Sequence, residues 1–338
     1  MLSQSPLVYI IILGWNNATN VIECLESLRQ LDYPNCRVVV VDNGSADNTV
    51  AIVRERFAEV HVIENRVNLG YAEGNNVGIR YALSNNADYL FILNDDTTVE
   101  PDVLAQLVRV GEADPQIGML GPSVVSYVSR SREYIGATIN WHDGTTAYGS
   151  AALPQTGDVD YLAGCALMVK VQVAREIGLL DAAYFCYFED ADWGMRCHRA
   201  GYRVVAVPQA KIYHKGTPDN LRHESPELLF FYLRNEYLFM RRYADWFKWL
   251  PFLLRYTRRC CLQYYGLVRQ AEWDKADAVI AGFWAGITRQ YGAQRVQAPK
   301  LVKSFIYGTG SALALFVRPF RSRWGVETDT TIRQFLKR

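Results

Sequence analysis

The sequence lacks the short motifs that mark several common classes of enzyme and redox protein. It has seven cysteines among 338 residues, and none forms a C-x-x-C pair, which excludes the usual thiol-redox and zinc spacings. No Walker sequence and no G-x-G-x-x-G occurs, which argues against a P-loop ATPase and a dinucleotide-dependent enzyme. Scattered cysteines, odd in number, are typical of reduced thiols and predict a cytoplasmic protein.

Long apolar runs are missing as well. No apolar stretch reaches the roughly 18 residues that a transmembrane helix needs. The apolar run at residues 7–13 is too short for a signal peptide and predicts a first β-strand. We therefore expect a cytoplasmic protein, with peripheral attachment to the inner face of the cell membrane as an open alternative.

Charge is distributed unevenly along the chain, although the formal net charge is only +1. Residues 1–227 carry 17 Lys or Arg and 28 Asp or Glu. Residues 228–324 carry 16 Lys or Arg and only 5 Asp or Glu. Such asymmetry indicates two parts that face different partners.

The first part of the chain alternates short apolar runs with stretches of helical periodicity. The predicted strands are residues 8–13, 37–41, 60–63 and 89–93, and the predicted helices are 20–31, 46–57 and 68–83. This alternation indicates βαβ units and a mostly parallel sheet. Ligands bind beyond the carboxyl ends of the strands in such sheets, and Asn16, Asp42 and the pair Asp95–Asp96 all follow predicted strands.

The pattern changes twice further along. Residues 122–215 contain predicted strands at 122–128, 161–169 and 203–207, a polar loop at 129–150 and a helix at 190–200. Beyond Pro226, aromatic residues interleave with Arg and Lys. We expect a catalytic domain over 1–225, with a nucleotide-binding half at 1–125 and an acceptor half at 126–225, and a helical region over 226–338.

Two adjacent carboxylates, Asp95 and Asp96, end the strand predicted at 89–93. Ionised acids side by side repel each other, and a divalent cation between them with an anion beyond would explain the pair. The alternative is that Asp96 or Thr97 caps the helix that begins near Pro101.

Two polar turns follow other strands. Asp42 could accept the N–H of a nucleobase or hold a ribose hydroxyl, or it could belong to turn chemistry. Asn68, Gly70 and Asn75 open a glycine-rich helix, where the glycine lets the helix approach the sheet and the asparagines could bind a nucleotide.

A second acidic cluster comprises Glu189, Asp190 and Asp192. Partial burial beside aromatic residues raises the pKa of a carboxyl group, which suits a general base. The alternative is an acidic helix N-terminus stabilised by the macrodipole. His214 follows a predicted strand, and a metal ligand and an ordinary polar residue are equally compatible with that position.

Together these motifs resemble family 2 glycosyltransferases of the GT-A fold, in particular bacterial rhamnosyltransferases and galactofuranosyltransferase-like enzymes of surface polysaccharide synthesis. The resemblance covers residues 7–216. It rests on five motifs in order: the strand ending in Asp42, Asn68-x-Gly70, Asn94-Asp95-Asp96, Glu189-Asp190-Ala191-Asp192-Trp193 and Tyr213-His214.

The resemblance implies an α/β fold of the Rossmann-like GT-A type, with a mostly parallel sheet, helices on both faces and a C-terminal helical, basic-aromatic region. It implies an inverting, metal-dependent sugar transfer with Asp190 as catalytic base, and Asp96 and His214 as ligands of Mn²⁺ or Mg²⁺. Asn94 stands where the family's D-x-D motif begins with Asp. The implied contacts to the nucleotide-sugar are Asn16, Asp42, Asn68, Gly70, Asn75, Asn94, Asp95, Gly164, Glu189, Asp192, Trp193 and Arg196.

The implied partners are a nucleoside-diphosphate-sugar donor and a saccharide or lipid-linked saccharide acceptor. For the basic-aromatic region, contact with an anionic membrane and packing as a helical subdomain both remain open. No nucleic-acid-binding motif accompanies the basic residues, so we expect no nucleic-acid partner. A sugar-nucleotide nucleotidyltransferase and a non-catalytic nucleotide-sugar-binding protein are the alternative functions. The first usually carries a basic glycine-rich N-terminal loop, and Gly14-Trp15-Asn16-Asn17 has no basic residue.

Overall fold

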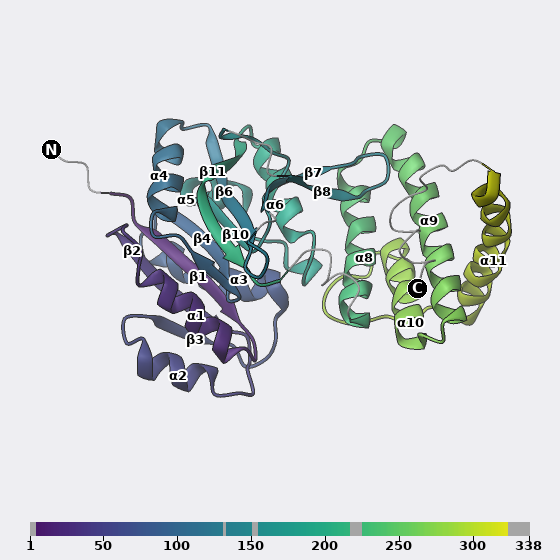
Figure 1. Ribbon diagram of the computed structural model, residues 1–338, viewed down its shortest axis with the longest axis horizontal. Helices are drawn as coiled ribbons and strands as arrows, with labels where there is room; N and C mark the ends of the chain where they lie inside the picture. Colours follow the sequence, from purple (N-terminus) through teal and green to yellow (C-terminus); the bar gives the residue numbers. More distant parts are fainter. Residues whose placement is uncertain (1–4, 131–132, 151–154, 217–224, 324–338) are drawn as a thin grey trace. The chain divides into compact units, whose positions relative to one another are not determined.

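The computed structural model describes residues 5–130, 133–150, 155–216 and 225–323. The chain forms two compact units. The first comprises Met1–Asn140 and Thr146–Asn220, and the second comprises Trp141–Thr145 and Leu221–Arg338. Figure 1 labels the helices and strands of both units.

The first half of the first unit is a parallel sheet linked by helices. Strands β1 (Val8–Gly14), β2 (Cys36–Asp42), β3 (His61–Glu64) and β4 (Tyr89–Asn94) lie in the order β3-β2-β1-β4. Helices α1 (Ala18–Leu28), α2 (Thr49–Arg56) and α3 (Gly70–Ser84) connect them. In register, Gly14 lies opposite Asp42, and Leu13 lies opposite Asn94. The ends of three strands therefore meet at one edge, and the predicted βαβ alternation is confirmed.

The second half makes the sheet mixed. The order continues β4-β10-β6-β11-β5, with β5 (Thr97–Val99), β6 (Ile117–Ser126), β10 (Ala166–Lys170) and β11 (Arg203–His214). Strand β10 runs antiparallel to both of its neighbours, whereas β11 runs parallel to β6. The parallel arrangement that the sequence predicts thus holds between β3, β2, β1 and β4, and β10 reverses it.

The polar loop predicted at 129–150 is wrong. This segment contains strands β7 (Glu133–Ile139) and β8 (Thr146–Ser150), which pair as an antiparallel hairpin. The Asp143 carboxylate accepts hydrogen bonds from the N–H and the hydroxyl of Thr145 in the connecting turn. In β7, Ile135, Ala137 and Ile139 are buried at alternate positions, but both strands are short and contain glycine, so this period was too brief to distinguish them from a loop. A short strand β9 (Gly157–Asp158) pairs with β11.

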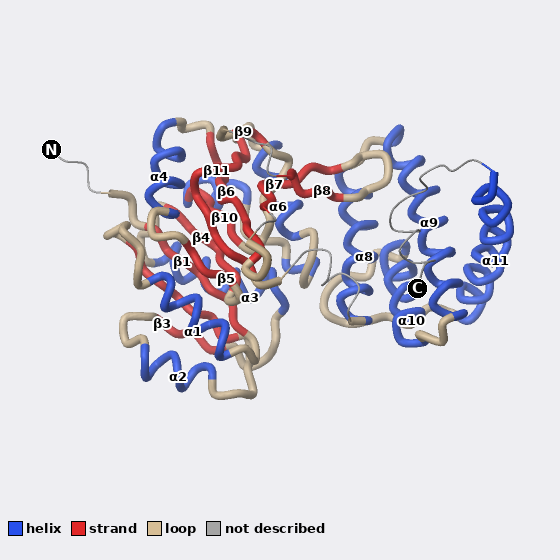
Figure 2. Tube along the Cα trace, viewed as in Figure 1, coloured by secondary structure: helices blue, strands red, loops and turns tan. Residues whose placement is uncertain are grey.

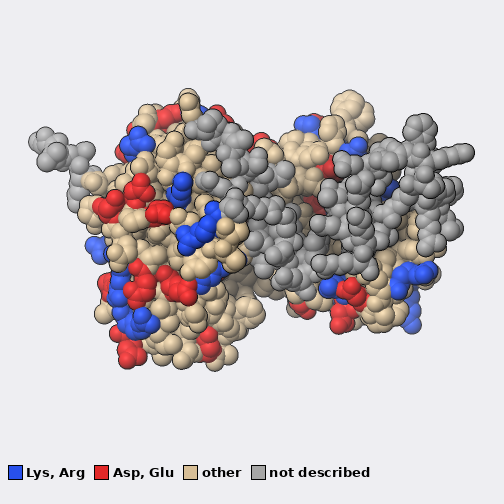
Figure 3. Space-filling model, viewed as in Figure 1, with Lys and Arg blue, Asp and Glu red and all other residues tan. Residues whose placement is uncertain are grey.

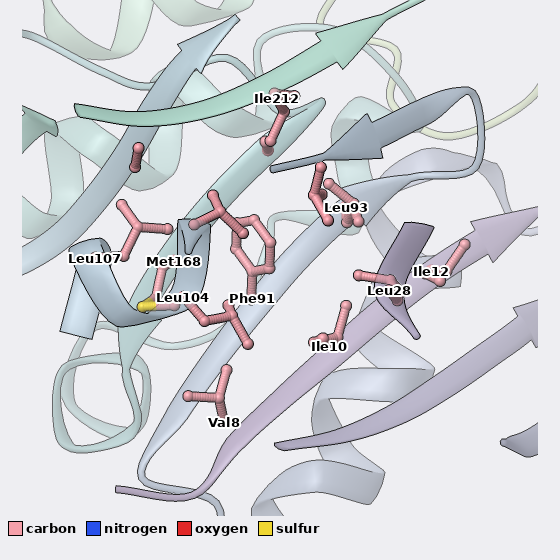
Figure 4. Close-up of a cluster of buried hydrophobic side chains, with 14 of the residues drawn as sticks. Val8, Ile10, Ile12, Leu28, Phe91, Leu93, Leu104, Leu107, Met168 and Ile212 are labelled. Atoms are coloured by element: carbon pink, nitrogen blue, oxygen red, sulfur yellow. The ribbon is translucent and has the colours of Figure 1, made fainter. Parts of the chain in front are cut away.

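Helices cover both faces of the sheet, because successive side chains along a strand point to opposite sides. On one face Ile10, Ile12 and Phe91 pack with Leu28 of α1 and Leu104 of α4 (Val103–Ala113), as Figure 4 shows. On the other face Tyr9, Ile11 and Ile92 pack with Ile79 of α3 and with residues of α5 (Val171–Ile177) and α6 (Glu189–Arg199). The predicted helices on both faces are confirmed.

The second unit is built of helices α8 (Pro226–Tyr243), α9 (Trp246–Arg269), α10 (Trp273–Ile287) and α11 (Lys300–Arg323), drawn blue in Figure 2. Ser225 and Asp245 cap α8 and α9, each accepting a backbone N–H three residues on. Aromatic side chains form much of the core, where the Tyr256 ring stacks on Phe283. Within the described ranges, no helix combines the length and apolarity that crossing a bilayer requires.

Candidate active site

Asp42 ends β2 with one carboxylate oxygen engaged and one unpaired. Its Oδ2 accepts the backbone N–H groups of Gly44 at 3.2 Å and Ser45 at 3.1 Å. Its Oδ1 is buried and has no hydrogen-bond partner among the described residues. A buried acceptor without a partner is costly, so Oδ1 is suited to receive an N–H or O–H group from a ligand.

Asn16 ties the loops after β1 and β2 together. It lies in the left-handed region at φ 51°, and its backbone N–H donates to Ser45 Oγ at 2.9 Å. Its Oδ1 accepts the N–H of Ala46 at 2.7 Å. Trp15, which the sequence analysis did not single out, precedes it and is 53% exposed. An exposed indole next to the Asp42 loop offers a flat apolar surface, and no sequence motif marks it.

Hydrogen bonds from asparagine side chains fix the start of α3. Asn68 Oδ1 accepts the N–H of Gly70 at 2.8 Å and the amide of Asn43 at 3.0 Å. The Asn43 carbonyl in turn accepts from Asn65 and from the backbone of Leu69. Asn43 is a residue that sequence reasoning missed, because its four contacts come from 22 to 27 residues away.

Asn75 lies one turn into α3. Its side chain is fully buried, and its amide donates to the carbonyl of Tyr71 at 2.9 Å. Its Oδ1 has no hydrogen-bond partner among the described residues. Asn75 therefore leaves a second buried acceptor near the same helix start.

In the turn Asn94-Asp95-Asp96, the pKa values of the two carboxyl groups shift in opposite directions. Burial, together with the charge of Asp96, raises the pKa of Asp95 to about 7. Burial also acts to raise the pKa of Asp96, but the nearby His214 imidazole and the backbone N–H of Gly216 outweigh it and lower this pKa below its usual value. Adjacent acids in a desolvated turn cannot both ionise cheaply, so a cation is the natural compensation.

Asn94 stabilises the turn through hydrogen bonds of its backbone groups. Its N–H donates to the carbonyl of Cys165 at 2.9 Å, and its carbonyl accepts the hydroxyl of Thr97 at 2.7 Å. These contacts need no carboxylate at this position. They explain how the turn keeps its shape although Asn94 departs from the D-x-D pattern.

Asp96 and His214 face each other across neighbouring strands, since His214 lies opposite Thr97 in the pairing of β11 with β5. Asp96 Oδ1 is 3.1 Å from His214 Nε2, yet neither atom has a partner with hydrogen-bond geometry among the described residues. His214 Nδ1 is also without a hydrogen bond among the described residues. These two buried atoms lie close together without a hydrogen bond between them, which is the arrangement expected of two ligands of one cation.

No group of three or more His, Cys, Asp or Glu side chains suited to a metal exists in the described part of the chain. An ion at Asp96 and His214 would therefore need further ligands from water or a substrate. Mg²⁺ typically binds in this way, through one or two carboxylates together with substrate phosphates.

Asp190 lies in the first turn of α6, and both of its carboxylate oxygens accept hydrogen bonds. Its Oδ2 accepts the N–H of Gly164 at 2.9 Å, and its Oδ1 accepts the N–H of Ala191 at 2.7 Å. Hydrogen bonds of this kind stabilise the ionised carboxylate. Because the next residue, Cys165, binds the N–H of Asn94, the dipeptide Gly164–Cys165 links Asp190 to the acidic turn after β4.

Tyr71 is a site residue that the sequence analysis missed. Its hydroxyl donates to the carbonyl of Gly164 at 2.5 Å, so the Gly164 peptide is held between Tyr71 and Asp190. Burial, together with the nearby carboxyl groups of Glu189 and Asp190, raises the pKa of Tyr71 well above its usual value, which keeps the hydroxyl protonated as a donor. This contact spans 93 residues, and no local pattern announces it.

The segment before α6 has a strained backbone. Phe185, Tyr187 and Phe188 all have positive φ angles, at 66°, 68° and 71°. The carbonyl of Phe185 accepts the N–H groups of Tyr71 and Ala72, which ties the segment to α3. Strain of this kind persists where surrounding contacts over-determine it, and it concentrates at functional sites.

Glu189 is buried beside Asp190. Its Oε2 has no hydrogen-bond partner among the described residues. Burial, followed by the charge of Asp190, raises the pKa of Glu189 well above its usual value. Burial beside Asp190 therefore disfavours the ionised form of Glu189.

Of three other residues predicted to contact ligand, Asp192 and Trp193 are buried and Arg196 is partly buried. Asp192 is fully buried and pairs with Arg196 Nε at 2.7 Å. Arg196 also donates to the carbonyls of residues 177 and 179. Trp193 is fully buried, and its indole N–H donates to the carbonyl of Gly178 at 2.8 Å. These side chains are engaged by the protein itself, and their contacts with a ligand stay predictions.

A family model described as Glycosyl transferase family 2 matches residues 9–178 of the chain. The N-acetylglucosaminyl-diphospho-decaprenol L-rhamnosyltransferase of Mycobacterium tuberculosis is 28% identical over 66% of this chain and 79% of its own. The dTDP-rhamnosyl transferase RfbF of Shigella flexneri is 24% identical over 70% of this chain and 80% of its own.

Two solved structures are also similar. One is the mannosyltransferase PcManGT from Pyrobaculum calidifontis in complex with GDP-Man and Mn²⁺, with a TM-score of 0.55 and 20% identity, covering 99% of this chain and 86% of that one. The other is GalNAc-T7 with UDP, GalNAc and Mn²⁺, with a TM-score of 0.61 and 15% identity. The match covers 86% of this chain and 59% of that one. At these identities the likeness speaks for the fold, and it confirms the predicted GT-A-like architecture.

Proposed function

The chain belongs to glycosyl transferase family 2, and from that premise we propose an inverting transfer of a sugar from a nucleoside diphosphate to an acceptor hydroxyl. The observation that carries this proposal is the dipeptide Gly164–Cys165. It hydrogen-bonds Asp190 through one residue and the acidic turn at Asn94 through the other. A proton acceptor and a diphosphate site joined by one peptide segment suit a direct displacement at the sugar between them.

Asp190 acts as the general base in this proposal. The acceptor O–H gives its proton to the Asp190 carboxylate as its oxygen bonds the anomeric carbon, and the bond from that carbon to the diphosphate oxygen breaks. Attack from the face opposite the leaving group inverts the configuration, as water does in inverting glycosidases. The N–H groups of Gly164 and Ala191 hold the carboxylate in place for this step.

Asp96 and His214 are the proposed ligands of Mn²⁺ or Mg²⁺. The unpaired buried atoms Asp96 Oδ1 and His214 Nε2 support this assignment, and a carboxylate with an imidazole is a donor pair that such ions accept. The bound ion would supply positive charge to the departing diphosphate. Asp95, adjacent to Asp96, is proposed to contact the waters of the ion or the donor sugar.

The loops after β1 and β2, with the start of α3, form the proposed nucleoside site. Asp42 Oδ1 is the proposed acceptor for a base N–H, and the exposed Trp15 ring the proposed stacking surface. Asn75 offers a second unpaired acceptor. Asn16, Asn68 and Gly70 shape these loops through their backbone contacts, and Gly164 lies beneath the donor sugar.

The curated relatives named above support a narrower substrate class. Their names describe rhamnosyl transfer, in one case to a diphospho-decaprenol-linked saccharide. We propose a rhamnosyl-type nucleotide donor and a lipid-linked saccharide acceptor in surface polysaccharide or glycolipid synthesis. The protein would then act in the cytoplasm, in peripheral contact with an anionic membrane.

A thermal-shift screen of nucleotide-sugars, with and without Mn²⁺, tests the proposed function. A ligand present at about 100 times its dissociation constant stabilises the folded state by about 2.7 kcal/mol. We expect one nucleoside-diphosphate-sugar to raise the melting temperature, and to raise it further with Mn²⁺. Asp96→Ala should remove the Mn²⁺ increment, and Asp32→Ala, an exposed acid, should keep it. A screen in which no nucleotide-sugar shifts the wild-type protein would contradict the proposal.

A further inference from the structure

One side of α9 exposes a group of large apolar side chains. Trp246, Phe247, Leu250 and Leu254 are between 53% and 68% exposed. Their spacing of four and three residues places them along one side of the helix. Phe252, Tyr256 and Cys260, on the opposite side, are fully buried. Contiguous exposed apolar side chains on a folded protein mark an interaction surface.

The same helix is strongly basic. Trp246–Arg269 contains five Lys or Arg residues and no Asp or Glu. Lys248 pairs with Asp245, and Arg259 pairs with Glu236. Arg255 and Arg258 are exposed, and neither has an ion-pair partner among the described residues. On the face of the first unit that Figure 3 shows, by contrast, acidic and basic side chains are mixed.

We infer that this side of α9 docks on the surface of an anionic lipid bilayer. The four exposed apolar side chains would enter the boundary between head groups and acyl chains. The guanidinium groups of Arg255 and Arg258 would contact lipid phosphates. Helices that lie in a membrane interface combine these features, with Trp, Phe and Leu on one face and cations beside it. An absence of acidic residues matters here, because carboxylates would be repelled by the same surface.

A second copy of the chain fits this side of α9 less well. A symmetric contact between two copies would bring the same patch together twice. Arg255 and Arg258 would then be desolvated near like charges, whereas protein interfaces are depleted of charged residues at their centre. A lipid surface supplies the anions that both guanidinium groups lack.

This inference extends the proposed lipid-linked acceptor, since docking would bring the enzyme to the membrane where such an acceptor lies. Docking itself requires no sugar transfer. It is therefore measured separately from the proposed function.

The test is co-sedimentation of the full chain with vesicles of phosphatidylcholine alone or mixed with phosphatidylglycerol. We expect preferential binding to the mixed vesicles. The double variant Phe247→Ser/Leu254→Ser should bind them roughly tenfold more weakly. The double variant Arg255→Gln/Arg258→Gln should lose on the order of tenfold on mixed vesicles and little on neutral ones.

The matched control is Trp273→Ser/Tyr291→Ser. These two side chains are 61% and 58% exposed, and α10, which begins at Trp273, carries Asp274 in its first turn. The control should bind vesicles like the wild-type chain. Three results would overturn the inference: no preference for anionic vesicles, an equal loss in the control, or a wild-type dimer in solution that Phe247→Ser/Leu254→Ser dissociates.

The donor-induced thermal shift of the same variants keeps the two proposals apart. Variants that lose vesicle binding should retain the full shift with nucleotide-sugar, which also shows that they are folded. A chain that binds vesicles but no nucleotide-sugar would refute the proposed function and leave the docking inference intact.

Discussion

Tyr71 holds the peptide between the two acidic clusters through a single hydroxyl. Tyr71→Phe removes the hydrogen bond to the Gly164 carbonyl and leaves the ring in place. The loss of one such bond costs about 1 kcal/mol, so we expect kcat to fall roughly fivefold. The donor dissociation constant should stay the same, because Tyr71 acts on Asp190 through Gly164 as a positioning residue.

Tyr202→Phe is the control for this substitution, because the Tyr202 hydroxyl donates to Glu176 on the exposed surface. It should leave kcat unchanged. Steady-state kinetics with varied donor separates the two parameters. A weakened donor affinity with unchanged kcat in Tyr71→Phe would argue for a direct donor contact instead.

Glu189 makes stability depend on pH. Its pKa in the folded state is raised above the ordinary value of 4.5, first by burial and then by the charge of Asp190. The folded state therefore binds more protons than the unfolded state above that value. The contribution of Glu189 to stability is full below this value and falls as the pH rises toward the folded-state pKa, by at most about 1.4 kcal/mol per pH unit.

Glu189→Gln should remove this slope, because the amide stays neutral at every pH. Urea unfolding at a series of pH values above about pH 5 measures the difference. We expect the variant to gain stability over the wild-type chain as the pH rises. A difference that does not change with pH would mean that Glu189 is ionised in the folded protein.

Single residues were predictable where one position carries a local signal. Asp42 ends β2 and Asp96 closely follows β4, and each has a buried oxygen without a hydrogen-bond partner among the described residues, so both stay proposed ligand-binding residues. Tyr71 and Asn43 were missed because their partners are distant along the chain. The burial of Trp193 could not be predicted, because an aromatic residue next to an acidic cluster can pack inward as well as face a ligand, and only the tertiary structure decides which.

At the scale of elements, the start of α3 depends on a glycine. Gly70 has φ 79°, and a Cβ there would lie 2.4 Å from the Phe185 ring. Gly201 has φ 86° with open space around it. We expect Gly201→Ala to cost about 1–2 kcal/mol from backbone strain alone. Gly70→Ala should cost more, and should also lower transfer activity because it moves the segment that precedes α6.

Chemical unfolding and transfer assays of both variants check this expectation. Gly201→Ala should keep wild-type kcat, since nothing in the site contacts Gly201. Equal destabilisation by the two substitutions would show that Phe185 moves aside without cost.

Strands were predictable from the sequence where their pattern of apolar residues matches their position inside the sheet. The four strands β1 to β4 emerged as apolar runs, and covered sheet interiors require such runs. The reversed direction of β10 was hidden, because an apolar strand has the same composition in either orientation. The hairpin of β7 and β8 was hidden by its polar, glycine-containing sequence.

At the scale of the whole molecule, the composition change near Pro226 coincides with the start of α8 and of an all-helical region. Charge asymmetry predicts that this region meets a different partner from the acidic first part, and the exposed side of α9 gives that prediction a definite surface. Composition could not say which side of which helix is exposed, because that depends on packing against α8, α10 and α11.

The central claim is that Asp190 takes the acceptor proton in sugar transfer, and Asp190→Asn tests it most directly. Asparagine keeps an oxygen for the Gly164 N–H but cannot accept a proton at neutral pH. We predict that transfer, measured as release of the nucleoside diphosphate, falls on the order of a thousandfold. The thermal shift with donor and Mn²⁺ should remain, because the donor site is intact. Near-normal turnover in this variant would contradict the account.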